Sequence, residues 1–363
     1  MHSMKHFFTA WQKPISYSSW FVMIIFLLVT GVVRSQSMEK GAFPLKELID
    51  SASIPGISIA FIEKGKLSYS EALGVKNVEI GEAIDTNTIF EAASLTKPIV
   101  AYCAMKMVEL GKLDLDKPLY QYMEYPDVAK DDRYKLITAR MVLSHNTGFP
   151  NWRANRSSDK MKINFDPGSH FGYSGEGFVF LQKVMEKLEG ANLNTLAKKW
   201  VFEPLGMSNS SLIFPDTENY AVGHNPQNEA RNKFKPNSPN AAYSMHTTAE
   251  DYAKFLIELL QPTGLNNSLQ EQMIQQQVLM DSSDPSLAWG LGVGIYVIED
   301  EELIWHWGDN GIFRAFFIIS PQQKKGFVYF TNSQNGLSIV NRLLDYTFSN
   351  PEIMKNWKEY DQF

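Results

Sequence analysis

The sequence predicts an α+β fold, in which an antiparallel sheet is flanked by the N- and C-terminal helices and interrupted by a mostly helical region. Segments with strand character lie near both ends of the chain, and successive strands follow one another as hairpins. The middle of the chain combines helical stretches with loops rich in Asn, Pro and Ser. Hairpin-connected strands favour an antiparallel sheet with helices on one face. We therefore expect a sheet subdomain (about 44–93 and 287–350) and a helical subdomain (about 112–285) within one folded unit, 36–363.

The composition is typical of a folded globular protein. The 363 residues are 44% hydrophobic and 20% charged. The formal net charge of −6 argues against nucleic-acid binding, which requires a basic surface. Cys103 is the only cysteine, so the chain has neither an internal disulfide nor a cysteine-based zinc cluster. Cys103 lies in an apolar stretch, and we expect it to pack in the core.

The first 35 residues differ from the rest of the chain. Residues 1–35 contain no Asp or Glu, and they include a 14-residue apolar run, Trp20–Val33. A run of this length is short for a membrane span and fits the core of a signal peptide. We expect cleavage near Ser35/Gln36 and a periplasmic or secreted mature protein. An uncleaved anchor is the alternative, and it would be the only contact with a membrane.

The predicted elements begin after this leader. Residues 44–53 form a predicted helix, because leucine and isoleucine recur there with helical spacing. Residues 57–74 are predicted to form two strands, joined by a hairpin turn at Lys64-Gly65-Lys66. An apolar helix over 94–110 follows.

The middle and the C-terminal part alternate between loops, helices and strands. The stretch 218–242 is the most loop-like part of the chain. Strand character returns from Leu287 onward, and a last helix is expected over 336–348. The expected middle helices are 177–189, 193–202 and 249–260.

Several kinds of chemistry find no support in the sequence. The five histidines after the leader form no H-E-x-x-H motif or other close ligand pair, so we expect no metal. There is no Walker loop, and the glycines of 289–294 do not match G-x-G-x-x-G. A G-x-S-x-G elbow is absent as well. We expect no cofactor.

A Ser-x-x-Lys motif offers nucleophilic chemistry. It occurs three times, at Ser37, Ser94 and Ser157, but only Ser94 opens a long apolar helix. Residues i and i+3 share a helix face, so Lys97 would lie beside Ser94. A lysine that is removed from water has a lowered pKa and can take part in deprotonating a serine. The alternative is that Ser94 is a helix cap and Lys97 a solvated residue of the first turn.

Two further segments favour the nucleophilic interpretation. Tyr173 lies in a glycine-rich loop just before a predicted helix, and His306-Trp307-Gly308 ends one strand before another begins. With Ser94-Leu95-Thr96-Lys97, these segments resemble the serine β-lactamase and penicillin-binding hydrolase family of the class C type. That family carries Ser-x-x-Lys, Tyr-x-Asn and Lys-Thr-Gly or His-x-Gly in this order. The resemblance extends from about residue 44 to 345, with further landmarks in MVLSHNTGFP (141–150), PGSHFGYS (167–174), EPLGMSNS (203–210), SMHTTAEDYAKFL (244–256) and FVYFTN (327–332).

The resemblance implies a β-lactamase/transpeptidase-like fold and a role for each motif. Ser94 would be the acylated nucleophile, while Lys97 and Tyr173 would share the general base and acid roles. The backbone N–H groups of Ser94 and Asp309 would form the oxyanion hole. The implied partner is a small-molecule or peptide-like substrate, bound by a monomer.

The third motif and the second differ from the family pattern in ways that concern substrate binding. His306 stands where many relatives have Lys, and it would help to bind a substrate carboxylate, by its charge if protonated and by hydrogen bonding if neutral. Gly175, Trp307 and Gly308 would also belong to the substrate-binding residues. Trp307 replaces a small Thr or Ser and is expected to fill or wall the acyl pocket. Gly175 replaces the family Asn, whose side chain contacts the lysine and the substrate amide.

These departures weaken a β-lactamase assignment. The sequence favours a secreted serine hydrolase that acts through an acyl-enzyme on ester or peptide-like amide bonds. A class C-type β-lactamase is the first alternative. A non-catalytic protein that binds ligands in the same cleft is the second.

Overall fold

The structure is a computed structural model that describes residues 44–153 and 161–348. The predicted leader (1–35) lies outside the described residues, as do the Ser-x-x-Lys copies that begin at Ser37 and Ser157. No helix in the two described ranges is long and apolar enough to cross a membrane.

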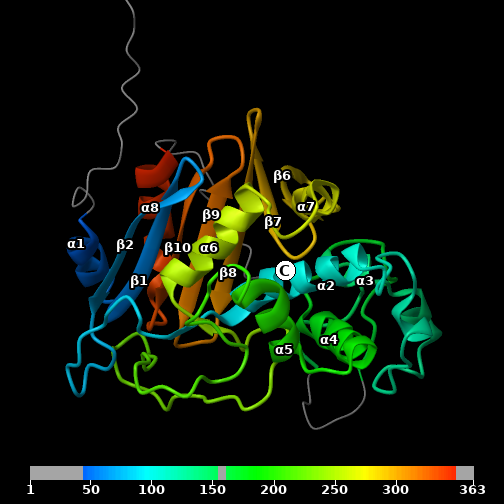
Figure 1. The fold of residues 1–363 in the computed structure, drawn as a ribbon, viewed down its shortest axis with the longest axis horizontal. Coiled ribbons are helices and arrows are strands. Elements are labelled where there is room, and N and C mark those ends of the chain that lie inside the picture. The colour runs from blue at the N-terminus through cyan, green and yellow to red at the C-terminus, as the bar shows by residue number, and fades with distance from the viewer. Residues whose placement is uncertain (1–43, 154–160, 349–363) are drawn as a thin grey trace, which may run out of the picture. The chain divides into compact units, whose positions relative to one another are not determined.

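An eight-stranded sheet forms the centre of the fold (Figure 1). All neighbouring strands are antiparallel, and the order is β2-β1-β10-β9-β8-β7-β6-β5. The strands are β1 (Gly56–Glu63), β2 (Lys66–Gly74), β5 (Val278–Asp281), β6 (Asp284–Trp289), β7 (Gly294–Ile298), β8 (Glu301–Asp309), β9 (Arg314–Ser320) and β10 (Lys325–Thr331). A separate pair consists of β3 (Phe90–Glu91) and β4 (His246–Thr247). The predicted α+β fold with an antiparallel sheet is therefore confirmed.

Helices cover the sheet, and most of them lie between β2 and β5 in the sequence. The helices are α1 (Leu45–Ser51), α2 (Thr96–Glu109), α3 (Ala139–Leu143), α4 (Gly175–Glu189), α5 (Leu193–Ala197), α6 (Ala249–Leu260), α7 (Asn267–Ile274) and α8 (Val340–Phe348). Shorter turns are η1 (Ala93–Leu95), η2 (Leu119–Gln121), η3 (Asp132–Leu136), the π-helical η4 (Lys198–Phe202) and η5 (Gly336–Ile339). The predicted hairpin at Lys64-Gly65-Lys66 and the three predicted middle helices agree with these elements.

Alternating side chains of the sheet face two different helices. Phe317 and Phe330 pack against Tyr252 of α6, with ring centroids 5.8 and 5.7 Å away. Phe61, whose side chain points to the other face, packs against Tyr346 of α8 at 5.8 Å. This alternation is the two-residue period of a strand, and both faces are apolar because both are covered (Figure 1).

Two features differ from the expected division into subdomains. The second run of sheet strands begins at Val278 of β5, not near Leu287. Strand β5 has only four residues and follows a glutamine-rich segment, so it has no distinct sequence signal. Helix α6 lies within the expected helical region, yet it packs on the sheet. An amphipathic pattern shows that a helix buries one face but does not show which element covers it.

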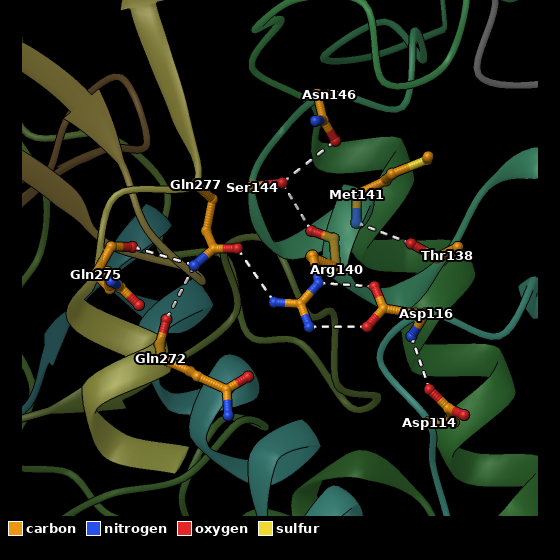
Figure 2. A network of polar contacts seen from close by, with 10 residues as sticks. All are labelled: Asp114, Asp116, Thr138, Arg140, Met141, Ser144, Asn146, Gln272, Gln275 and Gln277. Atoms are coloured by element: carbon orange, nitrogen blue, oxygen red, sulfur yellow. Dashed lines mark hydrogen bonds and ion pairs between the residues drawn. The ribbon is translucent and has the colours of Figure 1, made fainter. Parts of the chain in front are cut away.

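The helical region is joined to the edge of the sheet by a polar network (Figure 2). Arg140 of α3 binds both carboxylate oxygens of Asp116, at 2.7 and 2.9 Å. The third contact of its guanidinium is the side-chain oxygen of Gln277, 3.1 Å away and just before β5. The backbone continues this connection, because the N–H of Gly292 donates to the carbonyl of Leu143 at 2.8 Å.

Helix α2 runs through the interior between these parts. Eleven of its fourteen residues are buried, which explains why its sequence is apolar on all sides. Cys103 is fully buried on this helix, as expected for a core residue. The N-terminus of a completely enclosed helix is held rigidly, and the predicted nucleophile lies there.

We expect that Tyr252→Ala destabilises the protein by about 3–5 kcal/mol, because it removes a fully buried aromatic side chain from between α6 and the sheet. Tyr252→Phe keeps the packing and loses only the hydrogen bond from the hydroxyl to the carbonyl of Leu95, at a cost of about 1 kcal/mol. Urea unfolding followed by circular dichroism measures both values. Wild-type stability of the alanine variant would contradict the packing described here.

Candidate active site

Ser94 lies in the tight turn η1 that leads into α2. The preceding residue, Ala93, has a positive φ of 48°, which is unusual for a residue with a side chain. Hydrogen bonds fix the turn on both sides: the N–H of Ala92 donates to Met245, and the hydroxyl of Thr96 donates to the carbonyl of Ala93, at 2.8 and 2.6 Å. The strained turn exposes Ser94 partly while its neighbours are buried.

Lys97 lies one turn after Ser94 and on the same face of the helix. Its Nζ atom is 3.1 Å from Oγ of Ser94 and 2.9 Å from the carbonyl oxygen of Ala242. The side chain is completely buried, and this burial holds the pKa of Lys97 well below its ordinary value of 10.5. The alternative of a solvated first-turn lysine is therefore excluded.

Tyr173 approaches the same lysine from the start of α4. Nζ of Lys97 lies 4.6 Å from the centroid of the Tyr173 ring. The following residue, Ser174, caps α4 by accepting a hydrogen bond from the N–H of Gly177 at 3.0 Å. The structure thus brings Tyr173 together with Ser94 and Lys97, which lie 79 and 76 positions earlier in the sequence.

His145 holds the backbone on both sides of Tyr173. The N–H of Gly172 donates to the carbonyl of His145 at 2.6 Å, and the N–H of Ser174 donates to its Nδ1 at 3.0 Å. The imidazole also packs on the Tyr173 ring, with centroids 4.2 Å apart. Burial, with smaller contributions from Lys97 and His306, holds the pKa of His145 well below 6.5. The ring is therefore neutral and accepts at Nδ1.

The end of β8 lies directly against the turn that carries Ser94. A Cβ atom on Gly308 would lie 2.6 Å from the carbonyl oxygen of Ala92, so only glycine permits this approach. The contact brings the backbone of Asp309, the next residue, close to that of Ser94. Ser94 and Asp309 both line the pocket beside this contact.

His306 does not occupy the position that its expected role requires. The ring is fully buried, and it is not among the described residues that line the pocket. Its Nδ1 is 2.7 Å from the carbonyl oxygen of Trp307, and burial lowers its pKa to about 3. The expectation that His306 binds a substrate carboxylate is corrected on this basis. The strand alternation directs His306 inward and its neighbour Trp307 toward the pocket.

Trp152 fills the space that a side chain at position 175 would need. A Cβ atom on Gly175 would lie 2.8 Å from the outer edge of the Trp152 indole and 2.9 Å from the carbonyl oxygen of Asn151. Gly175 therefore supplies no side chain to the site, and its N–H donates to the Asn151 side chain at 3.0 Å. The glycine and the tryptophan are complementary in shape.

A pocket of about 650 Å³ opens above Ser94. Sequence analysis predicted four of its lining residues: Ser94, Tyr173, Trp307 and Asp309. It missed the other walls, because aromatic and amide residues in loops have no sequence pattern of their own. The missed residues are Glu91, Asn151, Trp152, Phe234, Tyr243 and Asn310.

No metal centre competes with this site in the described ranges. A search of those residues finds no group of three or more His, Cys, Asp or Glu side chains that could hold a metal ion.

Comparison with known proteins identifies the family. The family model described as "Beta-lactamase" matches residues 45–348, which is most of the chain. The chain belongs to the β-lactamase family. The resemblance inferred from the three motifs is therefore confirmed.

Individual relatives within the β-lactamase family are distant. "Protein flp" of Staphylococcus aureus (strain N315) is 23% identical over 307 residues, which cover 78% of this chain. The match spans 61% of flp, so this chain corresponds to only part of that relative's length. "Esterase EstB" of Burkholderia gladioli is 25% identical over 289 residues, covering 65% of this chain and 74% of EstB.

A solved structure confirms the fold. "A class C beta-lactamase" superimposes with a TM-score of 0.71 over 83% of this chain and 93% of that one. The sequence identity is 20%, so this similarity establishes the β-lactamase/transpeptidase-like fold and nothing about substrates.

We expect the stability of the protein to decrease as the pH falls below about 6.5. Burial lowers the pKa of both His246 and His306 from 6.5 to about 3, so each takes up a proton on unfolding between these values. Their stabilising contribution is complete above pH 6.5 and is lost toward pH 3. Each histidine should lower the free energy of unfolding by about 2 kcal/mol between pH 7 and pH 5.

Urea unfolding at pH 7, 6 and 5 measures this dependence. His246→Leu removes one buried imidazole and should reduce the slope of the unfolding free energy against pH by about one proton. An unchanged slope in this variant would show that His246 titrates alike in the folded and unfolded chain.

Proposed function

We propose that the protein is a serine hydrolase that acts through an acyl-enzyme on ester or peptide-like amide bonds. One observation carries the proposal: the buried amine of Lys97 lies within hydrogen-bonding distance of Oγ of Ser94, at the floor of an open pocket. A structural cap needs no buried lysine, because removing an amine from water is costly. The similarity to "Esterase EstB" of Burkholderia gladioli adds support.

In the first half of the proposed reaction, Oγ of Ser94 attacks the substrate carbonyl carbon. The Oγ proton passes to Nζ of Lys97, whose lowered pKa provides the neutral amine at moderate pH. The bond between the carbonyl carbon and the leaving group then breaks. Tyr173, beside the same amine, delivers the proton to the leaving group.

In the second half, water attacks the acyl-enzyme. The Lys97–Tyr173 pair accepts one proton from the water as the new C–O bond forms. The ester bond to Ser94 then breaks, and the pair returns one proton to Oγ. Negative charge on the carbonyl oxygen is stabilised in both halves by the backbone N–H groups of Ser94 and Asp309. The close approach of Gly308 to Ala92 supports this assignment.

The location and state of the protein are also part of the proposal. We propose that residues 1–35 are a signal peptide and that the mature chain acts in the periplasm or outside the cell. We propose a monomer that takes a small-molecule or peptide-like substrate. The apolar run Trp20–Val33 and the absence of acidic residues before Glu39 support the signal peptide.

We expect a fluorophosphonate probe to label the wild-type protein once and to leave Ser94→Ala unlabelled, as read by intact mass. The expected loss is complete, because the probe reacts only with an activated hydroxyl. Ser157→Ala is a matched control, since Ser157 begins another Ser-x-x-Lys sequence in the same chain. This control should label like the wild type.

A substrate panel then separates the hydrolase from its alternatives. Turnover of p-nitrophenyl esters, D-amino-acid amides or D-Ala-D-Ala peptides would support the proposal and define the bond type. Rapid turnover of nitrocefin would favour the β-lactamase instead. If neither the fluorophosphonate nor a fluorescent penicillin labels the wild type, the non-catalytic binding protein is the better interpretation.

We expect His145→Leu to slow acylation by up to about 100-fold, because Tyr173 loses the group that fixes its backbone. His145→Asn should retain most of the rate, since its side-chain oxygen can accept from Ser174 and asparagine tolerates the positive φ of 56° at this position. His145 does not line the pocket, so KM should change little in either variant.

Stopped-flow acylation by a p-nitrophenyl ester gives the rate, and thermal unfolding gives the stability of each variant. Equal acylation rates in the two variants would contradict a positioning role for His145. So would a slow His145→Leu whose rate merely follows a loss of folded protein.

A further inference from the structure

The described residues that line the pocket include no cationic side chain. Among the described residues that line it, Glu91 and Asp309 carry charge and both are acidic. The predicted contacts of a substrate carboxylate do not reach it either: His306 is buried and neutral, and Lys97 is enclosed beneath Ser94. A carboxylate placed in this pocket would lose water without gaining a cationic partner among the described lining residues.

The cations closest to the pocket walls are already paired. Nζ of Lys233 is 2.6 Å from one carboxylate oxygen of Glu91, and both side chains are more than nine-tenths buried. The second oxygen of Glu91 accepts from Nδ2 of Asn310 at 2.7 Å. Each carboxylate oxygen of Glu91 is therefore occupied, and the pair is neutral as a unit.

Two arginines near the site are held in the same way. Arg314 forms an ion pair with Asp309. Arg153, the residue after Trp152, contacts Glu176 at 2.6 Å and Asp127 at 2.9 Å. The charge of each arginine is therefore already balanced by at least one carboxylate.

The rest of the described lining consists of five aromatic side chains together with Ser94, Asn151 and Asn310. The indole of Trp152 packs edge-on against Tyr243, with ring centroids 5.7 Å apart. Trp307 packs on Tyr173 at 5.1 Å, and Phe234 is 57% exposed at the rim. Flat apolar walls favour a flat apolar group, because aromatic rings gain both burial and ring–ring contact.

We propose that the group bound in this pocket is uncharged and aromatic, and that substrates with a carboxylate in the same position are rejected. This inference deepens the proposed function and rests on it for catalysis. The selectivity itself is a property of binding and can be measured without catalysis.

Binding to Ser94→Ala tests the selectivity directly. N-phenylacetyl-glycinamide and N-phenylacetyl-glycine differ only in a terminal amide or carboxylate, and Trp152 and Trp307 provide a fluorescence signal from the pocket walls. We expect the amide to bind at least about tenfold more tightly, because the acid must desolvate its charge. Equal or tighter binding of the acid overturns the proposal, as does absence of binding by both at millimolar concentration.

Turnover by the wild type provides the second measurement. We expect kcat/KM for the p-nitrophenyl ester of monomethyl glutarate to exceed that for the free-acid ester at least about tenfold, with p-nitrophenyl phenylacetate better than both. A fluorophosphonate titration in parallel counts active sites. If labelling fails but the binding preference is found, the proposed function is wrong and the selectivity stands.

Variants of two wall residues assign the selectivity. Glu91→Gln keeps the hydrogen-bonding shape but leaves Lys233 without its counter-charge, so the preference for neutral over acidic ligands should fall severalfold. Trp152→Ala should lose the preference for phenylacetyl ligands, and the matched Trp152→Phe should keep most of it. Unchanged preferences in both Glu91→Gln and Trp152→Ala contradict the proposal, provided that their fluorophosphonate titre equals that of the wild type.

Discussion

The burial of one amine organises this structure. Lys97 lies in the first turn of a helix that is enclosed on all sides, and its polar partners are Oγ of Ser94 and a backbone carbonyl. A charged ammonium is costly in such surroundings, so burial lowers the lysine pKa and favours a neutral amine. Apolar elements packed around α2 provide these surroundings. The candidate site and the core around α2 therefore depend on the same packing.

Backbone proximity is the second constraint. Three separate segments must meet within a few ångströms of Ser94: its own strained turn, the end of β8 and the loop before α4. Gly308 allows β8 to touch the turn, and His145 holds the loop by two hydrogen bonds. Each device acts on main-chain atoms, which side-chain substitutions elsewhere do not disturb.

Sequence reasoning predicted the parts of this arrangement that depend on local pattern. The hairpin, the apolar α2 and the Ser94–Lys97 spacing are periodic signals, and each agrees with the structure. The failures concern tertiary context. The four residues of β5 are too few to show a periodic pattern. The apolar face of α6 predicts burial but not the element that covers it. His306 points inward because the strand alternation directs Trp307 outward. Trp152 could not be assigned to the site, because its role depends on a space created by Gly175, which is 23 positions away.

The pairing of Gly175 with Trp152 and of Glu91 with Lys233 points to one change in the character of the pocket. An asparagine side chain at position 175 would bring a polar amide toward the buried lysine, whereas an indole brings an apolar surface. A free lysine beside the pocket would attract an anion, whereas a lysine that is held by a buried carboxylate presents no net charge. Both features act in the same direction, since they favour shape and apolar contact over recognition of charged groups. The proposed chemistry at Ser94 requires neither, because the proposed attack, proton transfers and oxyanion contacts would involve only Ser94, Lys97, Tyr173 and the main chain. The reacting groups and the selectivity of the pocket are therefore separable, so changing the walls can redirect the same reaction to a different class of substrate.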